Sequence, residues 1–105
     1  MSLEHRWSAR KQVYWDAVVF HRPLGLLRAK ILNIGLEGAF IAADHVKLPV
    51  PSMVEVTFSF NSTGSRGICQ MEAMVIHRNR GGYGLMFKDF KLKAFRALKD
   101  ALYAA

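Results

Sequence analysis

Residues 54–60 read Val-Glu-Val-Thr-Phe-Ser-Phe, a strict alternation of apolar and polar side chains. Period two places every apolar side chain of this stretch on one face of an extended strand. Residues 27–31, Leu-Arg-Ala-Lys-Ile, repeat the pattern with two basic residues on the polar face. Both stretches are therefore predicted to be strands that are buried on one side only.

Turn-forming residues on either side of these two stretches divide the chain into segments. Prolines at 23, 49 and 51, the segment Asn-Ser-Thr-Gly at 61–64, and Gly81-Gly82 mark the breaks. The breaks predict six strands, near residues 13–22, 25–33, 38–43, 53–60, 67–78 and 82–88. Six short strands in hairpin-like succession indicate an antiparallel β-barrel, because closure hides the edges that an open sheet would leave unpaired.

The period changes near the end of the sequence. Four apolar side chains recur there at helical spacing, namely Leu92, Phe95, Leu98 and Leu102. Asp89 precedes them and is suited to capping a helix. We therefore predict a C-terminal α-helix over 90–103 that covers one opening of the barrel.

Composition describes one ordinary globular domain spanning residues 1–105, with a flexible basic arm at 1–12 and the barrel at 13–88. Apolar residues make up 51% and charged residues 22%, and 15 Lys and Arg against 8 Asp and Glu give a net charge of +7. That charge favours a polyanionic partner without identifying it. With neither an apolar run of about 18 residues nor a signal peptide, we expect no membrane insertion and a cytoplasmic protein.

The sequence gives little support for metal binding or catalysis. The single cysteine, Cys69, shares a strand face with apolar residues and is interpreted as a core side chain. The histidines at 5, 21, 45 and 77 lack ligand spacing, and no Ser-His-Asp or Cys-His arrangement can be read from the sequence. We expect no metal, no cofactor and no enzymatic activity.

Two short motifs carry the functional information. The first is Arg6-Trp-Ser-Ala-Arg10, and the second is Asn33-Ile-Gly-Leu-Glu-Gly38 at the end of an alternating segment. Arginine makes bidentate contacts with phosphates and with the O6/N7 edge of guanine. An amide can read a base edge, and glycines allow close approach of the backbone. The two motifs thus indicate an anionic guanine ligand.

These motifs resemble the signature of the PilZ domain, R-x-x-x-R followed by [D/N]-x-S-x-x-G. Gly35 stands where the family has serine, while Gly84-Leu-Met-Phe87 looks like the family's final strand and residues 91–103 like its closing helix. The resemblance covers nearly the whole chain. It implies a PilZ-like split barrel that binds cyclic di-GMP.

The resemblance assigns ligand-binding roles to Arg6, Arg10, Asn33, Gly35 and Gly38. Asparagine offers guanine one acceptor oxygen where aspartate offers two, which predicts weaker binding. Gly35 lacks the serine hydroxyl, a loss worth about 0.5 to 1.5 kcal/mol, although its backbone N–H is expected to remain a donor. Gly38 is expected to supply a left-handed or otherwise restricted conformation.

Two further positions follow from the resemblance. His77 lies about where family members place an aromatic that stacks on guanine; the alternative is an ordinary exposed strand histidine. His5 precedes Arg6, at a position that in the family influences whether one nucleotide or an intercalated pair binds. Histidine leaves that stoichiometry open.

Three functions remain open on the sequence alone. The first is a cyclic di-GMP effector or adaptor, acting on an unidentified protein partner in bacterial motility or biofilm control. The second is a PilZ-fold protein-interaction module that has lost nucleotide binding. The third is nucleic-acid binding, which the charge permits, but DNA is not expected because most aromatic residues fall on inferred inward faces.

Overall fold

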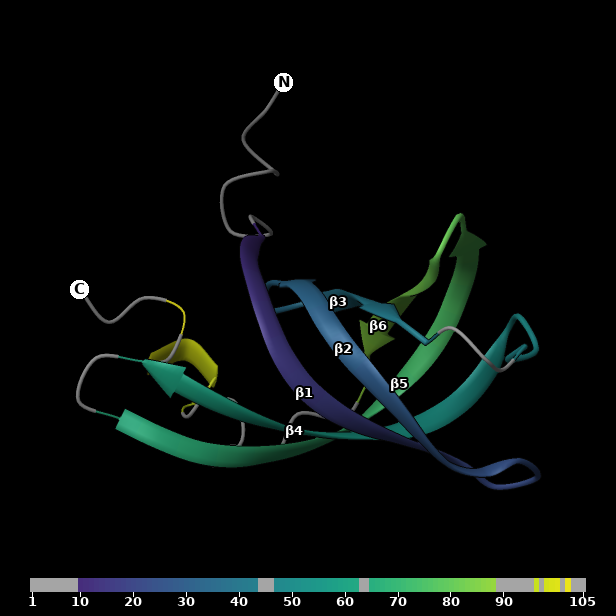
Figure 1. Cartoon of the computed structure of the whole chain (residues 1–105), viewed down its shortest axis with the longest axis horizontal. Coiled ribbons are helices and arrows are strands. Elements are labelled where there is room, and N and C mark those ends of the chain that lie inside the picture. Colours follow the sequence, from purple (N-terminus) through teal and green to yellow (C-terminus); the bar gives the residue numbers. More distant parts are fainter. Residues whose placement is uncertain are drawn as a thin grey trace.

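Six antiparallel strands close into a barrel in the order β1-β2-β3-β6-β5-β4 in the computed structural model (Figure 1). The structure describes residues 10–43, 47–62 and 65–88, together with residues 96, 98–100 and 102. The strands are β1 (Lys11–His21), β2 (Gly25–Ile34), β3 (Gly38–Ala42), β4 (Ser52–Ser62), β5 (Ser65–Asn79) and β6 (Gly82–Phe87). The predicted mainly β fold and antiparallel barrel are confirmed.

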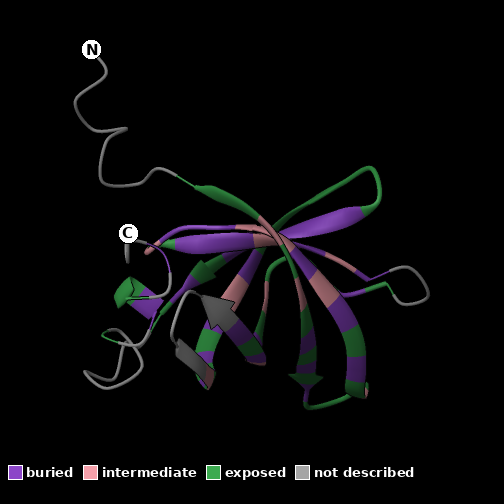
Figure 2. Ribbon diagram, turned by 60° about the vertical axis from the view of Figure 1, so that its left-hand side comes forward, coloured by how far each residue is buried: buried purple, intermediate pink, exposed green. Residues whose placement is uncertain are grey.

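The core is formed by the inward-facing half of each alternating strand. Figure 2 shows buried and exposed positions alternating along the strands. Val56 and Phe58 on β4 are almost completely buried, as are Ile31 on β2 and Val75 on β5. Burial of apolar surface stabilises the folded state by about 25 cal/mol per Å². The burial of these side chains is therefore the main stabilising contribution to the barrel.

The strand boundaries differ from the prediction mainly in one hairpin. The β4–β5 ladder continues past Phe60↔Gly67 to Ser62↔Ser65, so the turn is shorter than the predicted 61–64 segment. Gly67 allows this extension, because a Cβ there would lie 2.8 Å from the Phe60 ring. Ladder pairing and close packing override local turn propensity at this position.

The start of β1 also differs from the prediction. This strand begins at Lys11, so residues 11 and 12 belong to the sheet and not to the arm that was predicted to extend to residue 12. Their pairing with Ile34 and Asn33 of β2 explains the extension. Residues 1–9, the rest of the predicted arm, lie outside the described part of the chain.

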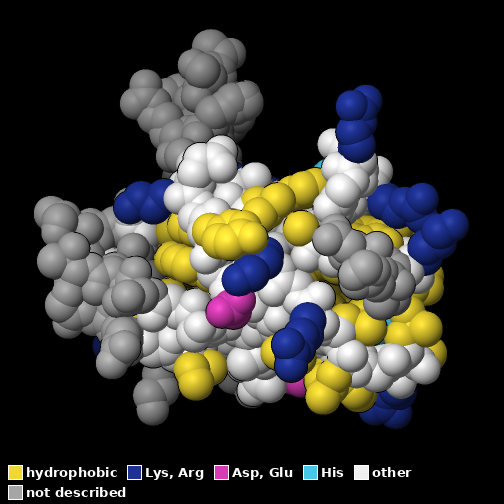
Figure 3. All heavy atoms as spheres, viewed as in Figure 1, with side chains coloured by type: hydrophobic (Ala, Val, Ile, Leu, Met, Phe, Trp, Pro, Cys, Tyr) yellow, Lys and Arg dark blue, Asp and Glu magenta, His cyan; other side chains and the backbone are white. Residues whose placement is uncertain are grey.

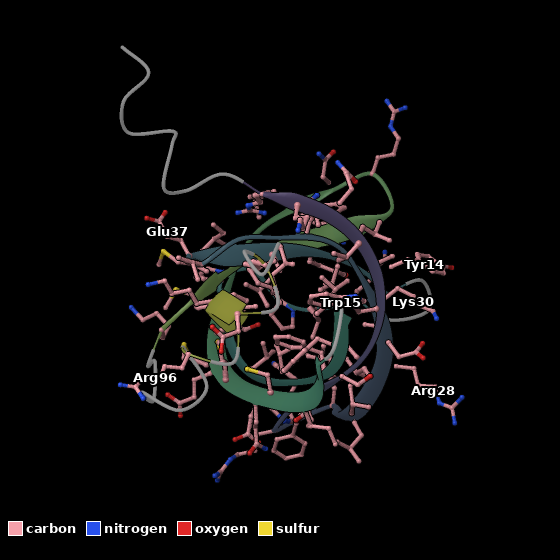
Figure 4. The ribbon with its side chains drawn as sticks, turned by 90° about the vertical axis from the view of Figure 1, so that its left-hand side faces the viewer. Tyr14, Trp15, Arg28, Lys30, Glu37 and Arg96 are labelled. Carbon is pink, nitrogen blue, oxygen red and sulfur yellow. The ribbon has the colours of Figure 1, made fainter. Side chains whose placement is uncertain are left out.

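Helical residues near the C-terminus pack on the barrel. Leu98 and Leu102 are buried in the same apolar cluster as the strand side chains. Lys11 at the start of β1 donates a hydrogen bond of 2.8 Å to the carbonyl of Leu102. Figure 4 shows the helix at one mouth of the barrel. A helix at this place is confirmed for Arg96, Leu98–Asp100 and Leu102; the expected cap, Asp89, lies outside the described residues.

Trp15 fills the barrel near this mouth. Its ring stacks on Phe58 with a centroid separation of 5.9 Å and lies 6.3 Å from the ring of Phe60. The side chain points inward, whereas its neighbour Tyr14 points outward (Figure 4). Within the described residues, no helix is long and apolar enough to span a membrane.

Candidate functional site

The end of β2 and the residue before β1 form the centre of the candidate site. Antiparallel pairing of Gln12 with Asn33 brings Arg10 to the end of β2. There, Nη1 of Arg10 donates a hydrogen bond of 3.0 Å to Oδ1 of Asn33. Both residues lie at the surface, so the second arginine of the first motif directly contacts the first residue of the second motif.

The turn between β2 and β3 is held by backbone hydrogen bonds. Gly35 N donates to Gly38 O at 2.9 Å, and Phe87 N donates to Glu37 O at 2.8 Å. The second bond ties the turn to the end of β6. Because the Gly35 N–H already has a partner, it is not available to a ligand in this conformation, contrary to the expectation from sequence.

Gly38 is required for close packing and not for a left-handed backbone. A Cβ on Gly38 would lie 2.1 Å from the carbonyl oxygen of Leu85 on β6. Positive φ angles occur among the described glycines at Gly25 and Gly81, not at Gly38. The same Cβ would lie 3.3 Å from Nη2 of Arg10. Of the two alternatives expected for Gly38, the left-handed conformation is therefore wrong, and the missing Cβ instead allows the close approach of the Arg10 guanidinium.

Outward-facing residues at paired positions form a row that runs from Asn33, beside Arg10, across β3 and β6 to β5. In register, Asn33 on β2 pairs with Phe40 on β3, Phe40 with Gly84 on β6, and Gly84 with His77 on β5. Inward neighbours in these strands, such as Leu85, are fully buried, so the row lies on the outer surface. Asn33 on β2 and His77 on β5, both predicted site residues, therefore lie on the same outer surface of the barrel.

Two rings in this row cover glycines. The Phe40 and His77 rings are stacked, with centroids 6.5 Å apart and planes 27° apart. A Cβ on Gly84 would lie 2.3 Å from Nε2 of His77, and one on Gly82 would lie 2.7 Å from the Phe40 ring. The glycines thus leave the space that the rings fill, which resembles the aromatic cover of strand glycines seen in other sheets.

Phe40 was missed in the sequence analysis. A signal for it existed: Phe40 lies two positions after Gly38 and so shares its strand face. The small residues at 82 and 84 likewise leave the first half of one face of β6 without side chains. Strand register across the barrel, which the sequence does not state, was needed to place Phe40 between Asn33 and His77.

The site residues divide into three groups by position. Arg10, Asn33 and Gly38 are in mutual proximity; Gly35 is buried in the turn between Asn33 and Gly38. His77 lies further along the row, three strands from Asn33. Arg6, the first arginine of the motif, and His5 lie outside the described residues.

The functional groups on this surface are suited to binding a ligand. The surface offers a guanidinium donor, an amide and two aromatic rings, while the carboxylate of Glu37 in the turn points away from the barrel (Figure 4). Within the described part of the chain, no three His, Cys, Asp or Glu side chains are arranged to hold a metal ion. The arrangement suits a planar anionic ligand.

Comparison with known proteins agrees with this geometry. The family model described as PilZ domain matches residues 6–104. No curated protein sequence matches the chain.

Several solved structures share the fold. The inhibitor of motility MotI/DgrA of Bacillus subtilis superposes with a TM-score of 0.73 at 17% identity over 90% of this chain. The chain spans only 46% of that protein. The PilZ domain of CeSA from a cellulose-synthesizing bacterium gives a TM-score of 0.64 at 16% identity, covering 92% of this chain and 97% of that one. An uncharacterized Legionella protein gives 0.56 at 15% identity, covering 90% of each chain.

Proposed function

The chain belongs to the PilZ domain family, whose members are binding and adaptor modules, and we propose that it is a cytoplasmic cyclic di-GMP effector. The observation that carries the proposal is the hydrogen bond between Arg10 and Asn33. This contact joins the two motifs of the family signature on one surface, although 22 residues separate them in sequence.

Arg10 is positioned to contact a phosphate or a guanine edge. Its planar guanidinium carries five donors, of which one is used by Asn33, so several remain for a ligand. The absence of a Cβ on Gly38 lets the guanidinium lie close to the backbone at the start of β3. A phosphate at this place would gain a charge-assisted, fork-shaped contact.

The outer row extends the same surface toward base recognition. Asn33 offers an amide to the Watson-Crick edge of guanine. Phe40 and His77 present a stacked aromatic pair along the row, and a guanine ring has a suitable face for stacking on either ring. The proposal thus assigns phosphate contact to Arg6 and Arg10, edge recognition to Asn33, and stacking to the His77 side of the row.

The ligand would act as a switch by fixing the segment that carries Arg6 over the barrel surface. Only a ligand with different affinities for two conformations can shift the equilibrium between them. In this mechanism cyclic di-GMP binds the arrangement in which both arginines contact it. The surface offered to a protein partner changes as a result, and control of motility or biofilm formation would follow from that partner.

Calorimetric titration of the purified protein with cyclic di-GMP tests the proposal. We expect saturable binding that is absent for GTP and lost in the Arg6→Ala/Arg10→Ala double variant. The stoichiometry will show whether one nucleotide or a pair is bound. A wild-type titration without heat, together with no thermal stabilisation at high ligand concentration, would overturn the proposal.

One observation favours a second candidate, a PilZ-fold interaction module without nucleotide. Gly35 supplies no hydroxyl, and its N–H is already bonded to Gly38 O. The turn therefore offers fewer donors to a ligand than a serine-containing turn would. If this candidate is correct, the Arg6→Ala/Arg10→Ala variant will bind the protein partner with wild-type affinity. Neither the wild-type protein nor the variant will then bind cyclic di-GMP.

A further inference from the structure

The outward face of β1 and β2 is unusually apolar for a solvated surface. Tyr14 and Leu26 are each 71% exposed, and Val18 and Phe20 are also exposed. Phe20 lies directly opposite Leu26 in the ladder, so their side chains are neighbours. We call the outward residues Tyr14 to Phe20 on β1 and Leu26 to Lys30 on β2 the β1–β2 outer face.

Basic side chains alternate with the apolar ones on this face. Arg28 is exposed and lies opposite Val18. Lys30 forms an ion pair with Asp16, and its ammonium lies 4.7 Å from the centroid of the Tyr14 ring. Figure 4 shows Tyr14, Arg28 and Lys30 pointing outward from the barrel. Figure 3 shows the resulting mixture of apolar and basic atoms, with few acidic atoms among them.

The charge of this face is positive after internal pairing. Asp16 is neutralised by Lys30, and its hydrogen bond raises the pKa of Lys30, which keeps the ammonium charged. In the portion of the chain that the structure describes, this is the only ion pair. The Arg28 guanidinium is therefore unpaired there and remains available to an anionic group.

The surface is hollowed beside the exposed tyrosine. An open depression of about 790 Å³ extends from this face across β4 to β5. Its lining includes Tyr14, Val18, Arg28, Lys30 and Ile68, together with Asp16, which is paired with Lys30. Ile68 is 74% exposed, so an apolar side chain stands at the far edge of the depression as well. A ligand seated here would meet apolar contacts on both sides and cationic groups along the β2 side.

We propose that the β1–β2 outer face docks an acidic, apolar segment of a partner protein. Apolar side chains of the segment would fill the depression between Tyr14 and Ile68 and cover Phe20 and Leu26. Its carboxylates would pair with Arg28, for which the fork geometry of guanidinium and carboxylate is well matched. An exposed apolar patch with polar and charged residues at its margin is a common form of protein-docking surface.

The Phe20 and Leu26 end of this face is remote from the proposed nucleotide site, whereas Tyr14 lies three residues after Lys11. The nucleotide site lies at the Lys11 end of β1, whereas Phe20 and Leu26 lie at the opposite end of the β1–β2 hairpin. The inference therefore does not rest on nucleotide binding, and the experiment below is done without nucleotide.

A selection from displayed random 12-residue peptides tests the proposal. We expect the full chain to enrich peptides in which Asp or Glu alternates with Leu, Phe, Ile or Trp. The best of these, synthesised with a fluorophore, should bind the wild-type protein saturably by fluorescence anisotropy. Either no enrichment, or enriched peptides without an acidic bias, would overturn the proposal.

Matched variants locate the binding surface. Arg28→Glu and Leu26→Ser should each weaken peptide affinity about tenfold, because both side chains are proposed to be buried on docking. Arg80→Glu makes the same change in net charge, and Ile76→Ser makes a comparable apolar loss on β5; both residues are exposed and lie outside the face. Affinities of these two control variants should stay within about twofold of wild type.

Other partners give different results. Equal weakening by Arg28→Glu and Arg80→Glu would show general charge attraction and would overturn the proposal. Vesicles containing phosphatidylserine, or oligodeoxythymidine, are not expected to bind in a manner sensitive to Leu26→Ser. If either does so while no selected peptide binds, the face belongs to lipid or nucleic acid and the proposal is wrong.

Discussion

Nη1 of Arg10 and Oδ1 of Asn33 lie 3.0 Å apart and form a hydrogen bond at the protein surface. The amide of Asn33 has one oxygen, which has two lone pairs. Arg10 occupies one of these, so a guanine N–H can be accepted at the other only beside the guanidinium. In the proposed complex, phosphate binding and base recognition would thus be coupled at a single atom.

Arg10→Lys is expected to weaken cyclic di-GMP binding by about tenfold or more, although it preserves the charge. Lysine cannot contact a phosphate in a planar fork while also donating to Asn33. Calorimetry at low salt measures the change, and Arg80→Lys, an equivalent substitution on an exposed turn, is the control. An unchanged affinity in Arg10→Lys would show that Arg10 acts by charge alone.

Asn33→Asp is expected to strengthen cyclic di-GMP binding roughly threefold to tenfold. A carboxylate has two acceptor oxygens, so one can accept from Arg10 while the other accepts from guanine. Competition titrations with cyclic di-GMP and cyclic di-AMP measure the effect, which should be confined to the guanine nucleotide. Equal gains for both nucleotides would contradict a role of residue 33 in reading the base.

Gly38→Ala is expected to destabilise the protein by about 2 to 3 kcal/mol, and Gly84→Ala by less than about 1 kcal/mol. The new methyl group at position 38 would meet the backbone carbonyl of Leu85, which ladder pairing holds in place, whereas at 84 it would meet the movable ring of His77. Urea unfolding of both variants measures the difference. Equal losses would show that the His77 ring is as tightly held as the backbone.

Cys69 is expected to react slowly with thiol reagents in the folded protein and rapidly in denaturant. Burial raises the pKa of the Cys69 thiol to about 11. The folded state therefore binds more protons than the unfolded state from about pH 8.5 to about 11, so this thiol lowers the free energy of unfolding as pH rises through that window. Denaturant titrations of wild type and Cys69→Ala across this range measure the contribution. Identical pH dependence in the two proteins would contradict it.

The sequence predicted the barrel because alternation is strong where strands are buried on one side. Residues 54–60 alternate without exception, and β4 has the expected inward face. The prediction was weakest at 61–64, where turn propensity favours a loop but Phe60 packing over Gly67 extends the hairpin. Local turn propensity contributes only a small free energy. The packing of Phe60 over Gly67 that opposes it cannot be read from the sequence.

The candidate site was only partly accessible to sequence reasoning. The contact between Arg10 and Asn33 follows from motif order once the strands are paired. The roles of Gly35 and Gly38 did not follow, because they depend on Gly38 O and Leu85 O, which belong to backbone geometry. Phe40 was missed because its position relative to His77 requires the register of three strands.

The hydrogen bond from Lys11 to the carbonyl of Leu102 joins positions 91 apart in the chain. During vectorial synthesis, β1 emerges from the ribosome first but meets its closing strand, β4, only after some 40 further residues. The helical residues that contact Lys11 emerge later still. Non-local pairing of this kind slows folding. The apolar faces of β1 to β3 therefore lack their closing partner until β4 has been synthesised, and closure of the barrel is expected to be a late step in folding.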